Sequence, residues 1–203
     1  MVNNILIVRT DRIGDLVLTT SMFPVLRNAY PEARITALVA PLTAPLLENN
    51  PYLDQVLVDD RQGMHKGFNG FCKLLGELKA EKFDLALVLH TKKRTNALCF
   101  FAGISRRVGF KNNKFGFLLN DPLRDIRPEG KLHEVEYCNK ILEHLGITGD
   151  KPELHISVSS ESDSWFEEWK KLRNITDDEQ IVCLHLGASD PAKRWPTERF
   201  CDL

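Results

Sequence analysis

The stretch from Asn4 to Asn28, NILIVRTDRIGDLVLTTSMFPVLRN, constrains the fold more than any other part of this chain. It opens with Ile5–Val8, an apolar run without polar alternation, which is typical of a strand buried on both faces of a parallel sheet. A polar loop ending at Gly14 follows, and apolar residues then recur at helical spacing. Strand, loop and helix form the first unit of a doubly wound α/β sheet, whose loops border the ligand crevice.

The same alternation continues through the first 154 residues. Apolar stretches predict further strands at 34–39, 55–58, 85–89 and 107–109, and helical patterns occupy 41–49, 68–79, 95–102 and 133–145. We expect one mainly parallel sheet with helices on both faces and the loops after Val8 and Leu89 at one edge. Residues 111–128 are expected to be irregular, and Pro24 is expected to kink the first helix.

A second domain is expected to begin near Leu154, so that 1–154 form an N-terminal domain and 155–203 a linker helix with the start of another Rossmann-like domain. A helix is predicted after Ser160, a short strand at Ile181–Leu184 and a helix start at Pro196. One strand and one loop cannot close a core, so we expect the sequence to stop inside this second domain.

Charge and cysteine content exclude several protein classes. The formal net charge of −1 argues against a protein whose whole surface binds nucleic acid. Five cysteines without a CxxC pair favour reduced thiols in a cytosolic protein, and His90 lacks partners at metal-ligand spacing. No apolar run approaches the roughly 20 residues that span a bilayer, so membrane contact is expected to be peripheral at most.

The first loop, RTDRIGD, offers two carboxylates, Asp11 and Asp15. A carboxylate at this edge of the sheet can act as a general base, and a helix N-terminus favours its ionised form. Position alone favours the alternative that Asp15 simply caps the helix, because aspartate is a common N-cap. Gly14 suits either a tight turn or close approach of a ligand.

A second loop, HLGASDPAKRWP, combines Gly187, Ser189 and Lys193 just before the predicted helix start. Backbone N–H groups, a hydroxyl and a lysine at a helix N-terminus suit a phosphate or diphosphate, although a solvated turn has the same composition. It is not a Walker loop, because GxxxxGK[ST] is absent.

A basic set falls in the middle of the chain, partly after the strand predicted at 85–89. Its members are Lys92, Lys93, Arg94, Arg106, Arg107, Lys111 and Lys114. Those that follow the strand would share the sheet edge with Asp15. An ordinary charged face is the alternative interpretation.

Three blocks together resemble glycosyltransferase family 9, the ADP-heptose lipopolysaccharide heptosyltransferases. They are ILIVRTDRIGDLVLTT, then FDLALVLHTKKRTNALCFFAGISRRVGF with FGFLLND, which is similar to the heptosyltransferase II branch, and GASDPAKRWPTERF, in which PAKRWP is the most specific string. The resemblance implies a GT-B architecture with an acceptor domain and a donor domain. It also implies metal-independent, inverting transfer of heptose from ADP-heptose to the anionic lipopolysaccharide core, at the cytoplasmic face of the inner membrane and without a cofactor.

The resemblance assigns roles to individual residues. Asp15 matches the general base, and Lys193 matches a residue that contacts the donor diphosphate, with Ser189 near its hydroxyl neighbour. Arg94 falls where family members have a lysine near the anionic acceptor, and Gly14 and Lys93 are grouped with it as acceptor-binding candidates.

The chain departs from the family pattern at a later donor-domain motif, DSG followed by a histidine, which has no counterpart before the sequence ends. This truncated chain alone is therefore expected to be inactive. Two alternatives stay open: a family relative that uses another nucleotide sugar or acceptor, and a non-catalytic α/β module that binds an anion at the same sheet edge.

Overall fold

The computed structural model describes residues 2–149, 153–188 and 190–202. They divide into two compact units, one ending at Ser159 and the other beginning at Ser160. The first unit extends past Leu154, our expected boundary, since the His155 N–H donates to Thr20 Oγ1 at 3.0 Å. Within these ranges, no helix combines the length and the apolar character needed to cross a membrane.

The first unit is built on one six-stranded sheet in the order β3-β2-β1-β4-β5-β6, in which every neighbouring pair is parallel. The strands are β1 (Asn4–Arg9), β2 (Arg34–Val39), β3 (Gln55–Val58), β4 (Leu85–Val88), β5 (Arg106–Lys111) and β6 (Asp121–Arg124). The predicted doubly wound parallel sheet is therefore confirmed, and β1 lies at its centre.

Strand β6 lies within 111–128, so the expectation that this stretch is irregular was wrong in part. Its sequence, DPLR, has neither an apolar run nor alternation, which is why periodicity could not reveal it. β6 is an edge strand paired only with β5, and an edge position tolerates Pro122, which has no N–H to donate.

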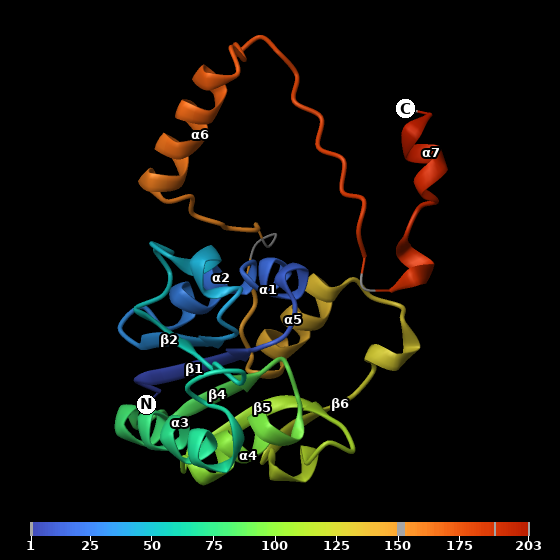
Figure 1. Ribbon diagram of the computed structural model, residues 1–203. Coiled ribbons are helices and arrows are strands. Elements are labelled where there is room, and N and C mark those ends of the chain that lie inside the picture. Colours follow the sequence, from blue (N-terminus) through green and yellow to red (C-terminus); the bar gives the residue numbers. More distant parts are fainter. Residues whose placement is uncertain (1, 150–152, 189, 203) are drawn as a thin grey trace. The chain divides into compact units, whose positions relative to one another are not determined.

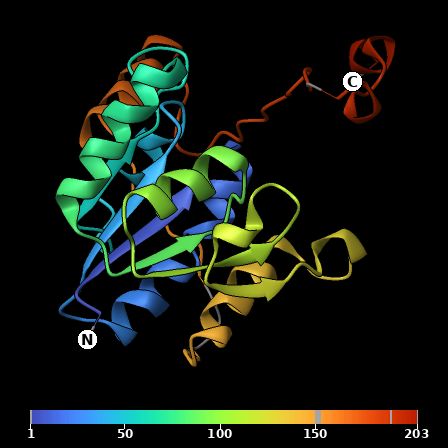
Figure 2. The same ribbon diagram turned by 90° about the horizontal axis from the view of Figure 1, so that it is seen from below.

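Helices cover both faces of the sheet, as Figures 1 and 2 show. In the first unit they are α1 (Ile13–Thr19), α2 (Met22–Ala29), η1 (Ala44–Leu47), α3 (Gly67–Glu81), α4 (Lys93–Phe101), η2 (Gly116–Leu118), η3 (Arg127–Glu129) and α5 (Glu134–His144). Helices α1, α2 and α5 pack on one face, and α3 and α4 on the other. Helix α4 begins two residues earlier than predicted, which places Lys93 and Arg94 inside it.

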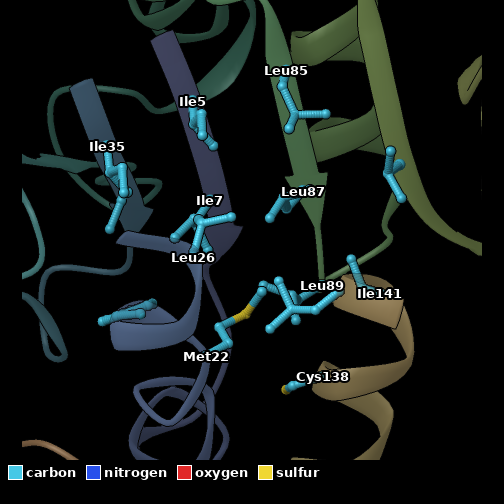
Figure 3. Close-up of a cluster of buried hydrophobic side chains, with 14 of the residues drawn as sticks. Ile5, Ile7, Met22, Leu26, Ile35, Leu85, Leu87, Leu89, Cys138 and Ile141 are labelled. Atoms are coloured by element: carbon cyan, nitrogen blue, oxygen red, sulfur yellow. The ribbon is translucent and has the colours of Figure 1, made fainter. Parts of the chain in front are cut away.

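Alternate side chains of β1 point to opposite faces of the sheet. Ile5 and Ile7 belong to the cluster under α1, α2 and α5, whereas Leu6 and Val8 belong to the cluster under α3 and α4. Figure 3 shows the first cluster between the strands and helices α2 and α5. Because both faces are covered, β1 has no polar face, which explains its uninterrupted apolar run.

The predicted kinked helix is in fact two helices, α1 and α2. Pro24 has no N–H for the Thr20 carbonyl, which instead accepts from the Phe23 N–H at 3.1 Å. The hydroxyls of Thr20 and Ser21 donate to the last carbonyls of α1, at 2.7 and 2.8 Å. The break therefore precedes the proline, at hydroxyl residues that satisfy the helix end.

The second unit contains α6 (Ser160–Leu172), η4 (Pro191–Lys193) and α7 (Thr197–Cys201). The α6 prediction is confirmed, and Pro196 is the N-cap residue of α7. The strand predicted at Ile181–Leu184 is wrong: these residues form no ladder and are exposed. A strand needs a neighbour for its N–H and C=O groups, and the described residues of this unit contain none.

Candidate active site

The site lies where the chain changes its winding direction, between β1 and β4. These strands are parallel neighbours, with Val8 paired to Val88. The N–H groups of Leu89 and His90 both donate to the Val8 carbonyl, at 3.1 and 3.2 Å. The loops after β1 and β4 therefore lie side by side, as predicted, at the position where open α/β sheets bind ligands.

A cavity of about 470 Å³ opens at this edge. Residues from the ends of β1, β4, β5 and β6 and from the starts of α1 and α5 line it: Arg9, Asp11, Asp15, Leu89, His90, Thr91, Lys92, Asn112, Asn113, Lys114, Asp125, Arg127, Pro128 and Glu134. Gly109 lets β5 approach the end of β4, because a Cβ there would lie 2.6 Å from the Val88 carbonyl oxygen.

One wall of the cavity is acidic and is organised around the Arg9 guanidinium, whose side chain is only 4% exposed. This group contacts three carboxylates: Asp11 at 2.9 Å, Asp15 at 3.3 Å and Glu134 at 2.9 Å. One positive charge faces three carboxylates, so this wall carries excess negative charge and can accept a proton.

The three carboxylates are not equivalent. Burial raises the pKa of Asp11, and the neighbouring Asp15 acts in the same direction, although Arg9 opposes both. Asp15 makes the longest contact with Arg9 and has the most exposed side chain of the three, 34% against 19% for Asp11 and 26% for Glu134. Asp15 is therefore the carboxylate most available to a bound ligand.

Asp15 does not cap the helix, which corrects the interpretation favoured by its position. The N-cap of α1 is Arg12, and Asp15 is the third helical residue. There the helix N-terminus still favours the ionised carboxylate. Gly14 precedes it with a φ outside the left-handed region and open space where a Cβ would lie, so the fold itself does not require this glycine.

The opposite wall carries positive charge from Lys92 and Lys114. A hydrogen bond with the Lys114 side chain, and then burial, lowers the pKa of Lys92. Arg127 also faces the cavity, but its guanidinium forms two 2.8 Å contacts with Asp125, which hold the Asp125 pKa below its usual range. The two lysines are therefore the cations with charge left for an anionic ligand.

His90 lies between the walls as a neutral ring. Burial lowers its pKa to about 3, and the nearby cations act in the same direction, led by Lys92. Arg61 donates to Thr10 Oγ1 at 2.9 Å, and this hydroxyl lies 3.0 Å from His90 Nδ1. A hydroxyl that accepts from Arg61 can give its own proton to Nδ1, which leaves the ring proton on Nε2 as a donor.

Arg94 shares the sheet edge with Asp15 but does not line the cavity. Its guanidinium binds both oxygens of the fully buried Asp59, at 2.8 and 3.0 Å, and the His65 carbonyl at 3.0 Å. Lys93 is exposed, and its Nζ lies 5.5 Å from the centre of the Phe115 ring. The structure thus brings Gly14 and Asp15 to the cavity mouth and turns Arg94 toward a structural partner.

The predicted donor-binding residues belong to the second unit. Ser189 lies outside the described residues. Lys193 is exposed at the end of η4, and its N–H donates to the Asp190 carbonyl at 3.0 Å. Asp190 caps this turn by accepting from the Ala192 N–H.

Sequence reasoning missed most of the residues that surround Asp15. Arg9 is the last residue of β1 and could have been singled out as a cation closing an apolar strand. Glu134 and Arg127 lie more than a hundred residues away, and no local pattern connects them to Asp15. In the described ranges, no group of three or more His, Cys, Asp or Glu side chains could hold a metal ion.

Comparisons with known proteins agree with this geometry. The family model for glycosyltransferase family 9 (heptosyltransferase) matches residues 71–203. Lipooligosaccharide heptosyltransferase 2 of Haemophilus influenzae is 26% identical over 98% of the chain, and lipopolysaccharide heptosyltransferase 2 of Escherichia coli K12 is 24% identical over 98%. The chain spans 59% and 58% of these two relatives.

Two solved structures have the same fold. A glycosyl transferase family 9 protein of Veillonella parvula superposes with a TM-score of 0.90 at 28% identity, covering 98% of this chain and 58% of that one. The E. coli ADP-heptose lps heptosyltransferase II gives 0.70 at 21% identity, covering 98% and 59%. Since the family model matches well over half of the sequence, this chain belongs to glycosyltransferase family 9.

Proposed function

We propose that the chain forms the acceptor-binding part of an inverting, metal-independent heptosyltransferase. The complete enzyme transfers heptose from ADP-heptose to the anionic inner core of lipopolysaccharide, at the cytoplasmic face of the inner membrane. In this proposal Asp15 is the general base. Family membership and the names of the relatives support the reaction class, and the cavity supports the assignment of roles.

The observation that carries the proposal is the placement of Asp15. Its carboxylate stands at a cavity mouth on the carboxyl edge of the sheet, in the first turn of α1 and 3.3 Å from the Arg9 guanidinium. The helix start and Arg9 both favour the ionised form that a general base needs. Arg9 also restrains the orientation of the carboxylate.

The chemistry follows from this placement. An acceptor hydroxyl that donates to Asp15 transfers its proton to the carboxylate as its oxygen attacks the anomeric carbon of the heptose. The new carbon–oxygen bond forms as the bond to the diphosphate oxygen breaks, and the bonding electrons leave with ADP. Attack opposite the leaving group inverts the anomeric centre.

The positive wall suits an anionic acceptor. Lys92 and Lys114 face the same cavity as Asp15, so a carboxylate or phosphate of the acceptor held there brings a neighbouring hydroxyl toward the base. Lys93 lies next to this wall and Gly14 leaves open space at the helix start. We propose Arg94 as an indirect contributor that fixes the adjoining loop through Asp59.

The sharpest test is Asp15→Asn in the full-length enzyme. The amide keeps the size of the side chain but cannot accept the proton, so transfer should fall by roughly 10²- to 10⁴-fold, the usual contribution of a general base. ADP binding, measured by calorimetry, should be unchanged. Near-native turnover of this variant would exclude Asp15 as the base.

The donor site is proposed to use Lys193, with Ser189 beside it. Lys193→Ala in the full-length enzyme should weaken ADP by roughly 10- to 150-fold, the range expected for one charge-assisted contact, and the loss should shrink at high salt. Adenosine should bind almost as before. An equal loss for both ligands would indicate a misfolded loop, and no loss for either would contradict the phosphate-binding role.

The relatives are only 24–26% identical, so the donor sugar and acceptor require their own test. We expect full-length enzyme to transfer from ADP-heptose and to reject other ADP- and UDP-sugars. Transfer from a different nucleotide sugar would retain the role of Asp15 and would assign the chain to another branch of the family.

A further inference from the structure

The middle of the chain concentrates positive charge. Residues 91–120 contain seven lysines and arginines and no aspartate or glutamate. Because the whole chain carries −1, the remaining residues carry −8. The cavity wall with Lys92 and Lys114 uses only two of these cations.

The same stretch exposes large aromatic side chains. Phe117 is 71% exposed, Phe100 42% and Phe115 39%. The rings of Phe115 and Phe117 contact each other, with their centres 5.6 Å apart. A folded domain rarely leaves such rings in water next to several cations without a partner to cover them.

These aromatics and lysines form one continuous surface. Helix α4 packs against η2, the two elements that carry them (Figure 2). Lys93 Nζ lies 5.5 Å from the Phe115 ring centre, and Asn96 Nδ2 donates to the Lys114 carbonyl at 2.9 Å. We define the basic–aromatic surface as Lys93, Phe100, Lys111, Lys114, Phe115 and Phe117.

The lysines of this surface keep their charge available. No ion pair joins Lys93, Lys111 or Lys114 to a carboxylate anywhere in the described part of the chain. By contrast, Arg94 and Arg106 of the same stretch are paired with Asp59 and Asp121. The surface therefore offers free ammonium groups beside exposed rings.

We propose that the basic–aromatic surface docks on an anionic phospholipid bilayer and presents the adjoining cavity to an acceptor whose lipid part stays in the membrane. Lysines attract anionic headgroups, and aromatic rings partition into the interface. Lys114 belongs to both the surface and the cavity, so a docked surface places the cavity next to the headgroups. The choice of acceptor rests on the proposed function, whereas the docking itself does not.

Two features favour lipid over a nucleic acid. Proteins that bind single strands stack bases on open aromatic faces, but the Lys93 ammonium occupies a position over the Phe115 ring. The free cations are lysines, which act as point charges on flexible stems, rather than the arginine forks that bind phosphates bidentately.

The test is co-sedimentation of this chain with vesicles, without donor or acceptor. Binding should be strong to phosphatidylglycerol mixed with phosphatidylethanolamine and weak to phosphatidylcholine alone. Phe117→Ser should weaken binding by about tenfold through the lost apolar contact, and Lys111→Gln by about fivefold through the lost charge. Neither residue lines the cavity, so transfer to a water-soluble acceptor fragment by the full-length enzyme should be unchanged.

Phe68→Ser is the matched control, because Phe68 is 79% exposed on α3, outside the surface, and this variant should bind vesicles like the unmodified chain. Equal binding to both vesicle types would overturn the proposal, as would an equal loss in Phe68→Ser and Phe117→Ser. Charge-dependent binding that Phe117→Ser leaves intact would also overturn it and would point to a nucleic acid or an acidic protein. Loss of transfer in Asp15→Asn with normal vesicle binding would separate the two proposals.

Discussion

Two clusters at the same edge of the sheet are built from inverse proportions of the same groups. At Asp59, one fully buried carboxylate is neutralised by two guanidinium groups, those of Arg61 at 2.9 Å and Arg94 at 2.8 Å. At Arg9, one buried guanidinium faces three carboxylates, among them Asp15. The first cluster has every carboxylate oxygen occupied, whereas the second keeps negative charge that is only partly compensated.

The difference separates a structural role from a chemical one. A carboxylate bound by two arginines has no capacity left for a proton or a substrate, but it fixes the loop after β3 to the start of α4. A guanidinium shared among three carboxylates can orient them and still leave one free to react. Proximity to the sheet edge alone therefore does not identify the catalytic group; the ratio of charges does.

The largest effect on stability is expected from Asp59→Ala. Removal of one partner from a buried ion pair typically costs about 3–5 kcal/mol, because the remaining charge is left buried without compensation. Urea unfolding of the chain should show a loss of this size. Glu143→Ala, which removes an exposed pair with Lys140, should cost less than about 1 kcal/mol, and similar losses in both variants would contradict the structural role of Asp59.

A smaller loss is expected from Arg94→Lys. Lysine keeps the charge but cannot contact both oxygens of Asp59, so the unfolding free energy should fall by about 1.5–3 kcal/mol. Arg61→Lys should cost less, because Arg61 is the more exposed partner. If Arg94→Lys instead raised KM for the acceptor without loss of stability, Arg94 would be an acceptor-binding residue, as the resemblance implied.

The acidic cluster should respond to pH in the opposite sense from an ordinary paired carboxylate. Burial raises the folded-state pKa of Asp11, so its contribution to stability is present below the unfolded pKa and is lost as pH rises through the folded one. Asp11→Asn should therefore stabilise the fold at pH 7, and this gain should vanish in acid.

Asp125→Asn provides the control of opposite sign. The hydrogen bond from Arg127 lowers the pKa of Asp125, so its stabilisation is present at neutral pH and is lost as pH falls. This variant should destabilise the fold at pH 7. If chemical unfolding at several pH values gave the same sign for both variants, the contrast between the two kinds of carboxylate would be wrong.

The smallest effect expected is the absence of a titration. With its pKa lowered to about 3 by burial and the surrounding cations, His90 should stay neutral from pH 8 to about pH 5. Its imidazole NMR signals should then stay fixed over this range. A midpoint near the ordinary histidine value of about 6.5 would show that the cavity is more solvated than the contacts of His90 imply.

The sequence predicted the sheet because buried parallel strands leave an unambiguous local signature. The runs at 5–8 and 85–89 have no polar alternation, and both became central strands. β6 escaped because a short edge strand needs little apolar surface, and the strand at 181–184 failed because an apolar run forms no ladder without a neighbour. Local pattern therefore predicted strands only where packing on both faces was certain.

The site was predictable to the same local extent. Asp15 and Gly14 follow a buried strand, so topology alone placed them at the ligand edge. The partners of Asp15 and Arg94 are set by pairing across distant segments, as in Arg9 with Glu134 and Arg94 with Asp59. Ion pairs over such separations leave no periodicity in a single sequence, which is why the role of Arg94 was not foreseen.

The most direct test compares the three carboxylates around Arg9 in the full-length enzyme. Asp11→Asn, Asp15→Asn and Glu134→Gln each replace one carboxylate by an amide of the same shape, and each is assayed for transfer and for ADP binding. Only Asp15→Asn should lose roughly 10²- to 10⁴-fold in turnover, with ADP affinity unchanged, while the other two stay within about tenfold of the unmodified enzyme. An equal loss in Asp11→Asn or Glu134→Gln, or near-native turnover in Asp15→Asn, would contradict the assignment of Asp15 as the base.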